Sequence, residues 1–156
     1  MATEIERKFL VEGPLELDGP GRVMEQGYIA LDPEKGTEVR IRIEEGINTL
    51  AVKRGGGMVR TEIEIEVDDE KARALWALTE GRRLTKSRYI RPYRNHRVEI
   101  DVYGGALSGL IVADVEFSSE AEALAFEPPA WLGREITGDA AYRNNVLARL
   151  GSPPAG

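Results

Sequence analysis

The segment TEVRIRIEE, residues 37–45, alternates charged and apolar side chains along most of its length. Successive side chains of a β-strand point to opposite faces, so Arg40 and Arg42 would share one face while Val39 and Ile41 share the other. The period of two therefore predicts a strand with one charged face and one apolar face. This separation decides the fold because it recurs along most of the chain.

Eight segments show this alternation and are expected to be short strands: 3–11, 22–31, 37–45, 48–54, 59–67, 83–91, 96–103 and 111–118. Residues that favour turns separate several of them: Asp32-Pro33, Glu45-Gly46, Gly55-Gly56-Gly57 and Gly104-Gly105. Short strands with short connections favour an antiparallel barrel or sandwich.

Three stretches break the alternation and are predicted to be helices: 68–80, 119–126 and 139–150. The first begins with acidic residues, which suit the N-terminal end of a helix. Ser118 or Ser119 would cap the second, and Thr137 or Asp139 the third, which Gly151 would end. The expected fold class is mainly β with flanking helices.

Length and composition favour one globular domain. The chain has 156 residues, of which 42% are apolar and 31% charged, as in a folded protein with a core of its own. We find no repeat, low-complexity tract or linker that would divide it. We expect a single domain over residues 1–151 and a flexible tail over residues 152–156.

The charge balance and the rare residue types exclude several classes of function. Lys plus Arg number 21 and Asp plus Glu 27, so the net charge of 21 − 27 = −6 argues against non-specific binding to nucleic acid or to a membrane surface. With no cysteine and the single histidine His96, thiolate and imidazole metal sites are not expected. No membrane span or apolar leader is evident, so we expect a cytoplasmic protein.

The charged faces of the predicted strands carry blocks of one sign. Acidic blocks are Glu4/Glu6, Glu62/Glu64/Glu66, Glu99/Asp101 and Asp114/Glu116, and basic blocks are Arg40/Arg42 and Lys86/Arg88. A solvated sheet face explains any one strand taken alone. A face selected only for solubility would mix the signs, however, because like charges repel and opposite charges attract weakly.

Blocks of one sign are tolerated where a ligand of the opposite sign binds between them. Carboxylates suit a hard divalent cation, whereas Arg and Lys suit phosphate oxygens. If the charged parity points inward, the strands enclose a closed polar tunnel. Helices 68–80 and 139–150 could then cover the apolar exterior.

The opening stretch EIERKFLV, residues 4–11, resembles the ExExK signature of CYTH domains, the triphosphate tunnel metalloenzymes. Further matches in the same order are QGYI (26–29), VRIR (39–42), Lys53, EIE (62–64), KSRY (86–89), VEIDV (98–102), DVEF (114–117) and EITGD (135–139) with Tyr142. These matches cover nearly the whole chain.

The resemblance implies an eight-stranded antiparallel β-barrel that forms a closed tunnel, with Mg²⁺ or Mn²⁺ as cofactor. The metal would be held or surrounded by Glu4, Glu6, Asp101, Asp114 and Glu116. The substrate would be bound by Lys8, Arg40, Arg42, Lys53, Lys86 and Arg88. Tyr28 is a further substrate-binding candidate at the tunnel mouth, with packing as the alternative for an aromatic residue in a strand. The catalytic set would comprise Lys53, Lys86, Glu62 and Glu64. Lys53 or Lys86 would stabilise charge on the leaving phosphate, and Glu62 and Glu64 would belong to a network that positions water or metal. One carboxylate among Glu4, Glu62 and Glu64 could orient the attacking water.

Within this family the chain is most similar to the bacterial inorganic tripolyphosphatases, notably in EIERKFLV, in TEGRR (79–83) and in PPAW (128–131). This implies metal-dependent hydrolysis of tripolyphosphate to pyrophosphate and phosphate. The alternatives are a class IV adenylyl cyclase-like enzyme, a triphosphatase for thiamine or nucleoside triphosphates, and a non-enzymatic polyphosphate-binding module. The expected partner is a small triphosphate, with no nucleic acid or membrane partner, and a homodimer is among the assemblies considered.

Overall fold

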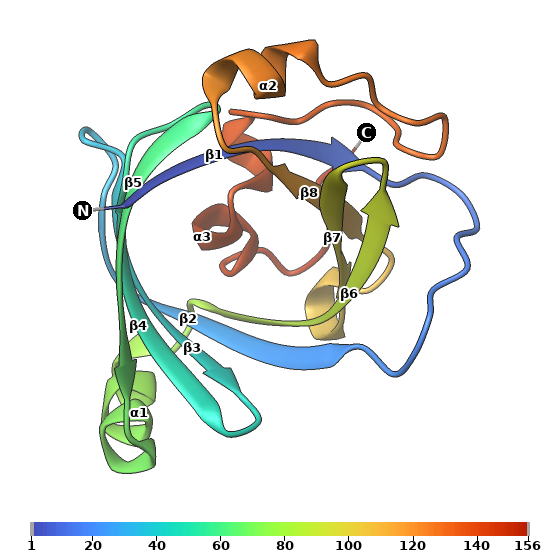
Figure 1. The fold of residues 1–156 in the computed structure, drawn as a ribbon. Coiled ribbons are helices and arrows are strands. Elements are labelled where there is room, and N and C mark those ends of the chain that lie inside the picture. Colours follow the sequence, from blue (N-terminus) through green and yellow to red (C-terminus); the bar gives the residue numbers. More distant parts are fainter. Residues whose placement is uncertain (1, 156) are drawn as a thin grey trace.

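A computed structural model describes residues 2–155 and shows a closed barrel of eight antiparallel strands in the order β1-β5-β4-β3-β2-β6-β7-β8 (Figure 1). The strands are β1 Ala2–Leu10, β2 Arg22–Asp32, β3 Thr37–Glu44, β4 Ile47–Arg54, β5 Val59–Val67, β6 Arg83–Tyr93, β7 His96–Tyr103 and β8 Ile111–Glu116. The predicted fold class and all eight strands are confirmed, with ends that differ by at most a few residues.

The predicted division of faces also holds. Charged residues of the inward parity are buried inside the barrel, among them Glu38, Arg40, Lys53 and Asp101. On the outer surface of β1, β7 and β8, apolar residues form a cluster beneath α2, Glu120–Ala125, and the loop that follows it. Ser119 caps α2 by accepting a hydrogen bond from the backbone N–H of Glu122, as one of the two predicted caps.

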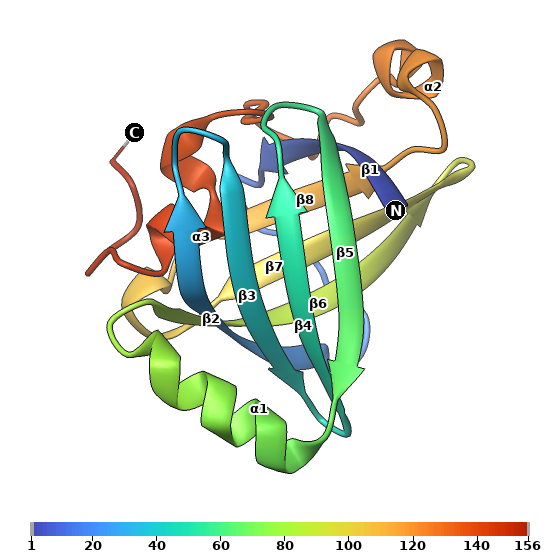
Figure 2. The same cartoon turned by 90° about the vertical axis from the view of Figure 1, so that its left-hand side faces the viewer.

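The helix predicted over 68–80 is α1, Asp69–Trp76, followed by the 3₁₀ turn η1, Ala77–Thr79. Asp68 is the N-cap and accepts a hydrogen bond from the backbone N–H of Lys71. The helix lies outside the barrel beside β2, β3 and β4 (Figure 2). Gly27 allows η1 to pack closely against β2, because a Cβ there would lie 2.5 Å from Thr79 Oγ1.

The prediction of one helix over 139–150 is wrong. The segment forms the 3₁₀ turn η3, Ala140–Tyr142, and the short helix α3, Asn144–Leu147, separated by Arg143 in an extended conformation. Asp139 accepts a hydrogen bond from the Ala141 N–H, so one of the predicted caps is present. The asparagines that follow Arg143 are weak helix formers, which favours this short, broken arrangement.

This C-terminal segment also lies elsewhere than predicted, at one end of the barrel instead of over its exterior. Leu10 ends β1, Leu84 lies near the start of β6 and Tyr103 ends β7, and these strand ends pack with Tyr142 and Leu147 in one buried apolar cluster. Figure 1 shows α3 inside the outline of the ring of strands. The remaining short element is the 3₁₀ turn η2, Gly105–Leu107.

The apolar outer face of β5 is exposed. Ile63 and Ile65 are 52% and 55% exposed, and Figure 2 shows β4 and β5 facing the viewer with no helix in front of them. Among residues 2–155, no helix combines the length and apolar character needed to cross a membrane.

Candidate functional site

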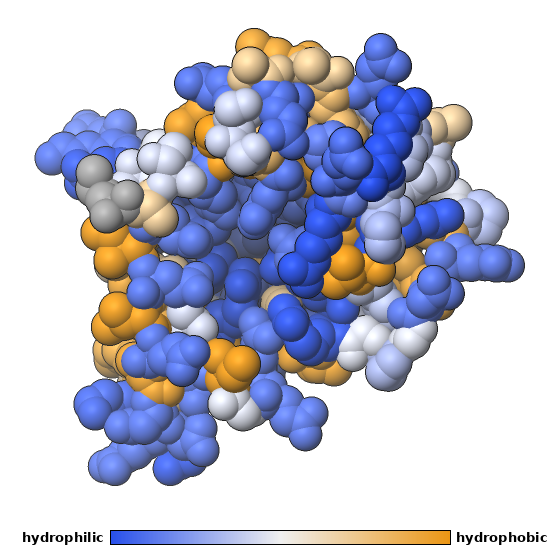
Figure 3. All heavy atoms as spheres, viewed as in Figure 1, coloured by the Kyte–Doolittle hydropathy of each residue, from blue (hydrophilic) through white to orange (hydrophobic). Residues whose placement is uncertain are grey.

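The barrel contains a cavity of about 450 Å³ whose lining is almost entirely charged. Figure 3 shows hydrophilic side chains gathered around this hollow. Within the described residues 2–155, Ile47 is the one apolar side chain in the lining. The predicted polar interior is therefore present, although residues of the C-terminal segment, including Asn144, lie across one end of it.

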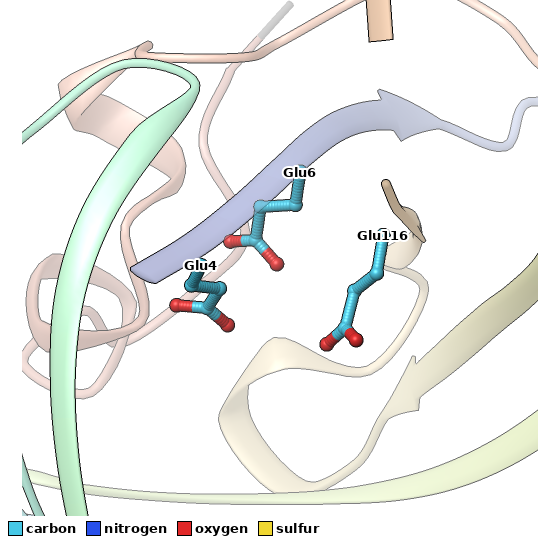
Figure 4. A group of neighbouring side chains, drawn as sticks. All are labelled: Glu4, Glu6 and Glu116. Atoms are coloured by element: carbon cyan, nitrogen blue, oxygen red, sulfur yellow. The ribbon is translucent and has the colours of Figure 1, made fainter. Parts of the chain in front are cut away.

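Three carboxylates on one side of the cavity form a compact group. Glu4 and Glu6 belong to β1 and Glu116 to β8, and one oxygen from each lies within 4.8 Å of the other two (Figure 4). The strand register explains the grouping, because Glu6 lies opposite Glu116 and Glu4 is two residues earlier on the same face. This geometry suits a hard divalent cation, which prefers carboxylate oxygens.

The electrostatics of this group depend on the cations around it. Burial raises the pKa of Glu4 although Lys53 opposes the shift, and burial together with the nearby Glu99 raises the pKa of Glu116. Burial also acts on Glu6, yet its pKa is lowered overall because Lys8, Lys53 and two arginines favour its charged form. Bringing carboxylates together raises the cost of charging them, and a bound cation would remove that cost.

Lys53 connects this group to a second set of carboxylates. Its Nζ lies 3.1 Å from Glu4 Oε2 and 3.2 Å from Glu62 Oε2. Glu62 is opposite Lys53 in the β4–β5 register, and Glu64 lines the cavity two residues further along β5. The structure therefore brings together Lys53, Glu62 and Glu64, which the sequence placed in the catalytic set.

Arg40 and Arg42 of β3 line the cavity with few compensating contacts. Arg40 is 3% exposed, and its Nε has no hydrogen-bond partner within residues 2–155. Arg42 Nε donates to Gln26 Oε1 at 3.0 Å. Burial, with Arg40 and Arg88 nearby, lowers the pKa of Arg42 to about 10. These guanidinium groups retain donors that an oxyanion could accept from.

Lys86 and Arg88 of β6 are held differently, and of the two only Arg88 lines the cavity, so the structure does not bring Lys86 together with the other predicted substrate-binding residues. Both oxygens of Asp101 accept from Arg88 at 2.7 and 2.9 Å, and Lys86 Nζ donates to Asp101 Oδ2 at 2.7 Å. Arg88 also pairs with Glu99 at 3.2 Å. Burial lowers the pKa of Lys86 to about 7 against the attraction of Asp101. The structure does not bring Asp101 into the group of Glu4, because its oxygens are occupied by these cations.

Asp114 and Lys8 face each other across β8 and β1. Lys8 Nζ lies 3.6 Å from Asp114 Oδ1 and 3.7 Å from Glu6 Oε1. Burial raises the pKa of Asp114 to about 7 although Lys8 opposes the shift. Asp114 therefore lies beside the carboxylate group without completing it, and Lys8 lies in the cavity wall as predicted for a substrate-binding residue.

Tyr28 is not at the mouth of the cavity, where the sequence interpretation placed it. The side chain is fully buried in the apolar cluster at the closed end of the barrel. Its hydroxyl oxygen accepts a hydrogen bond from Gln26 Nε2 at 3.3 Å. Tyr28 points inward from β2, and the C-terminal segment covers this end of the barrel. Together these two features bury the side chain.

Sequence reasoning missed a polar network beside the closed end. Glu38 pairs with Arg60 Nη2 at 3.2 Å and accepts from Asn145 Nδ2 at 2.7 Å. Glu38 and Arg60 border a small cavity of about 50 Å³ that also contacts Arg143. The parity of Glu38 with Arg40 was a signal for its inward position, but no local pattern indicated the contact with Asn145.

Comparison with known proteins places this geometry in context. No family model matches the sequence. The inorganic triphosphatase of Nitrosomonas europaea is 41% identical over 147 residues, which cover 94% of this chain and 97% of that protein. The inorganic triphosphatase of Acetivibrio thermocellus is 35% identical over 152 residues, covering 96% and 95%.

A solved structure agrees with these sequence relatives. The crystal structure of an inorganic triphosphatase matches with a TM-score of 0.69 at 38% identity, covering 96% of this chain and 97% of that one. The likeness therefore extends over the whole barrel, including the strands that carry the charged lining. With 41% and 35% identity to its curated relatives over nearly the full length, the chain belongs to the inorganic triphosphatase family.

Proposed function

We propose that this protein hydrolyses inorganic tripolyphosphate to pyrophosphate and phosphate inside its charged cavity, with Mg²⁺ or Mn²⁺ as cofactor. The observation that carries the proposal is the side-by-side placement of a carboxylate group and a wall of cations. Glu4, Glu6 and Glu116 suit a divalent cation, and Arg40 and Arg42 face the same cavity with donors to spare. A chain of phosphates with a bound metal ion would present positive charge to the carboxylates and negative charge to the arginines.

Glu4, Glu6 and Glu116 would hold the cation, since their oxygens converge and oxygen ligands suit Mg²⁺ and Mn²⁺. When bound, the cation neutralises charge on phosphate oxygens and keeps the phosphate chain in a fixed orientation. Asp114 lies next to this group, since Lys8 Nζ contacts both Asp114 and Glu6, and it would help to orient the group from the side. We therefore assign direct metal contact to the three glutamates.

The cations of the cavity would bind and align the substrate. Arg40 and Arg42 present planar donor groups, which fit phosphate oxygens in pairs, while Lys8 adds a point charge. Phosphoryl transfer passes through a loose transition state, so positioning and charge stabilisation supply most of the catalysis. Lys53 contacts both Glu4 and Glu62 and is therefore placed to stabilise charge on the leaving phosphate.

Glu62 and Glu64 would orient the attacking water. They lie on β5, which pairs with the strand that carries Lys53, and Glu62 contacts the Nζ atom of Lys53. A carboxylate in this position can accept a hydrogen bond from water and direct its lone pair at phosphorus. Arg88, held by Asp101, would complete the positive wall from β6, and Lys86 would support it from behind through the same carboxylate.

A substrate panel tests the proposal. Purified protein with Mg²⁺ or Mn²⁺ is given tripolyphosphate, ATP, thiamine triphosphate and pyrophosphate in parallel, and the products are resolved by ion chromatography. We expect the highest kcat/KM for tripolyphosphate, because the cavity lining offers charged groups and almost no apolar surface for a base. Cyclic AMP from ATP would contradict the proposal, as would metal-independent binding without turnover.

The metal assignment has its own variants. Glu4→Gln and Glu6→Gln should lose most metal-dependent turnover and keep the circular dichroism spectrum of the wild type, because amides keep the shape but coordinate hard cations poorly. Glu66→Gln is the matched control, since Glu66 lines the same cavity outside the carboxylate group. Full activity of both variants at limiting Mg²⁺ would remove them from the site.

A further inference from the structure

Gln26 is a fully buried amide between Arg42 of the cavity wall and Tyr28 of the apolar cluster at the closed end of the barrel. It lies on β2 directly opposite Arg42 of β3, and its Oε1 accepts from Arg42 Nε at 3.0 Å. Its Nε2 donates to the Tyr28 hydroxyl oxygen at 3.3 Å. The backbone of β2 is paired with β3 and β6 at Gln26, and the two side-chain hydrogen bonds hold the amide in place. Gln26 therefore fixes the position of one guanidinium nitrogen.

The acceptor that holds Arg42 is neutral, which distinguishes it from the acceptors of Arg88. Arg88 donates to both oxygens of Asp101 and to Glu99, so carboxylates offset its charge. Among residues 2–155, no carboxylate forms an ion pair with Arg42. A buried guanidinium is costly without a counter-charge. Because no carboxylate in the described part of the chain pairs with it, the Arg42 guanidinium stays available to an incoming anion.

We propose that Gln26 is a positioning residue, which orients Arg42 through a neutral hydrogen bond and thereby leaves the positive charge of Arg42 free for the phosphate chain. The inference rests on the proposed function, because it assigns Arg42 to substrate binding. A carboxylate at position 26 would hold Arg42 equally well in the ligand-free protein, yet it would compete with phosphate for the same guanidinium.

The test is Gln26→Glu, with two measurements that should move in opposite directions. We expect the ligand-free Tm to rise, because the new carboxylate pairs with Arg42 and relieves its repulsion with Arg40 and Arg88. Affinity for imidotriphosphate with Mg²⁺, measured by calorimetry, should fall at least tenfold, equivalent to about 1.4 kcal/mol. A residue with only a structural role would lose stability and affinity together.

A double-mutant cycle separates a specific contact from a general increase in negative charge. In an Arg42→Gln background, Gln26→Glu should change affinity by less than twofold. Equal losses in the two backgrounds would overturn the proposal. Gln26→Met removes the acceptor without adding charge, so we expect a lower ligand-free Tm and a smaller loss of affinity than with Gln26→Glu. Wild-type affinity in Gln26→Met would also overturn it.

The wild-type protein distinguishes this inference from the proposed function. If the wild type neither binds imidotriphosphate nor hydrolyses tripolyphosphate, the proposed function fails. If the wild type does both and Gln26→Glu binds equally well, the proposed function stands and the role of Gln26 is wrong.

Discussion

Two walls of the barrel interior, β3 and β6, carry inward-facing cations and hold them differently. On β3, Arg40 and Arg42 have a neutral partner or none on their Nε atoms. On β6, Lys86 and Arg88 share Asp101. The first wall keeps its positive charge unpaired at the expense of stability, whereas the second neutralises much of it. Ligand binding should therefore depend most on β3, and folding on β6.

The largest expected effect is on stability, at Asp101. Asp101→Asn leaves Lys86 and Arg88 buried with less counter-charge, and breaking such a buried pair costs about 3–5 kcal/mol. Urea unfolding of the ligand-free protein measures the loss. Asp114→Asn is the comparison variant, because Asp114 makes a longer contact to its cation. A loss below about 1 kcal/mol, the order of magnitude for an exposed pair, would show that Asp101 does not stabilise β6 strongly. That result would contradict the expected difference between the two walls.

Arg40→Ala should show the opposite balance. Each charge-assisted hydrogen bond to the substrate is worth about 1.5–3 kcal/mol, so calorimetry with imidotriphosphate should detect a loss of that order. The ligand-free Tm should stay constant or rise, because an unpaired buried cation is removed. Arg40→Lys should restore only part of the affinity, since a point charge cannot replace a planar donor group. Full rescue would reduce Arg40 to a source of diffuse positive potential.

The dependence of stability on pH should report on Asp114. Its pKa of about 7 in the folded protein exceeds the ordinary value of 3.8, so the folded state binds the proton more tightly. This contribution is present at low pH and is lost as pH rises from about 4 to about 7. Relative to Asp114→Asn, the wild type should lose at most about 1.4 kcal/mol per pH unit. Parallel stability curves for the two proteins would contradict the shift.

The smallest effect is expected at the rim of the cavity. Glu64 and Glu66 are exposed on β5 and line the same cavity. Replacing either by Gln should change the free energy of unfolding by less than about 0.5 kcal/mol. Only Glu64→Gln should lower kcat, because Glu64 belongs to the proposed water-positioning pair. Equal kcat values for the two variants would remove Glu64 from that role.

The sequence predicted the fold well because the period of two is a local property. The alternation separated a charged face from an apolar face, and the blocks of like charge favoured an inward direction for the charged face. Together they identified most of the residues that line the cavity. Parity cannot reveal register, however. Asp101 and Asp114 both face inward from their strands. Only strand pairing shows that Asp101 is bonded to Lys86 and Arg88 instead of lying with Glu4.

Contacts between distant segments account for the other differences. Tyr28 is buried because residues near Tyr142 and Leu147 cover that end of the barrel. The contact from Asn145 to Glu38 spans most of the chain, so no local pattern could predict it. The break at Arg143 likewise follows from packing at the barrel end, where a continuous helix would direct its side chains differently.

The end of the β1–β8 pairing gives the carboxylate group a second consequence. β1 pairs with β5 over four residue pairs, Ala2–Ile5, and with β8 only from Glu6 onward. Glu4 thus lies just beyond the end of β8, whereas Glu116 lies on it. A cation shared by these carboxylates would link β1 to β8 at the point where their pairing ends, just after the hydrogen bond from the Phe117 N–H to the Ile5 carbonyl. We expect amide hydrogens of Thr3 to Ile5 to exchange with deuterium quickly without metal and more slowly with it.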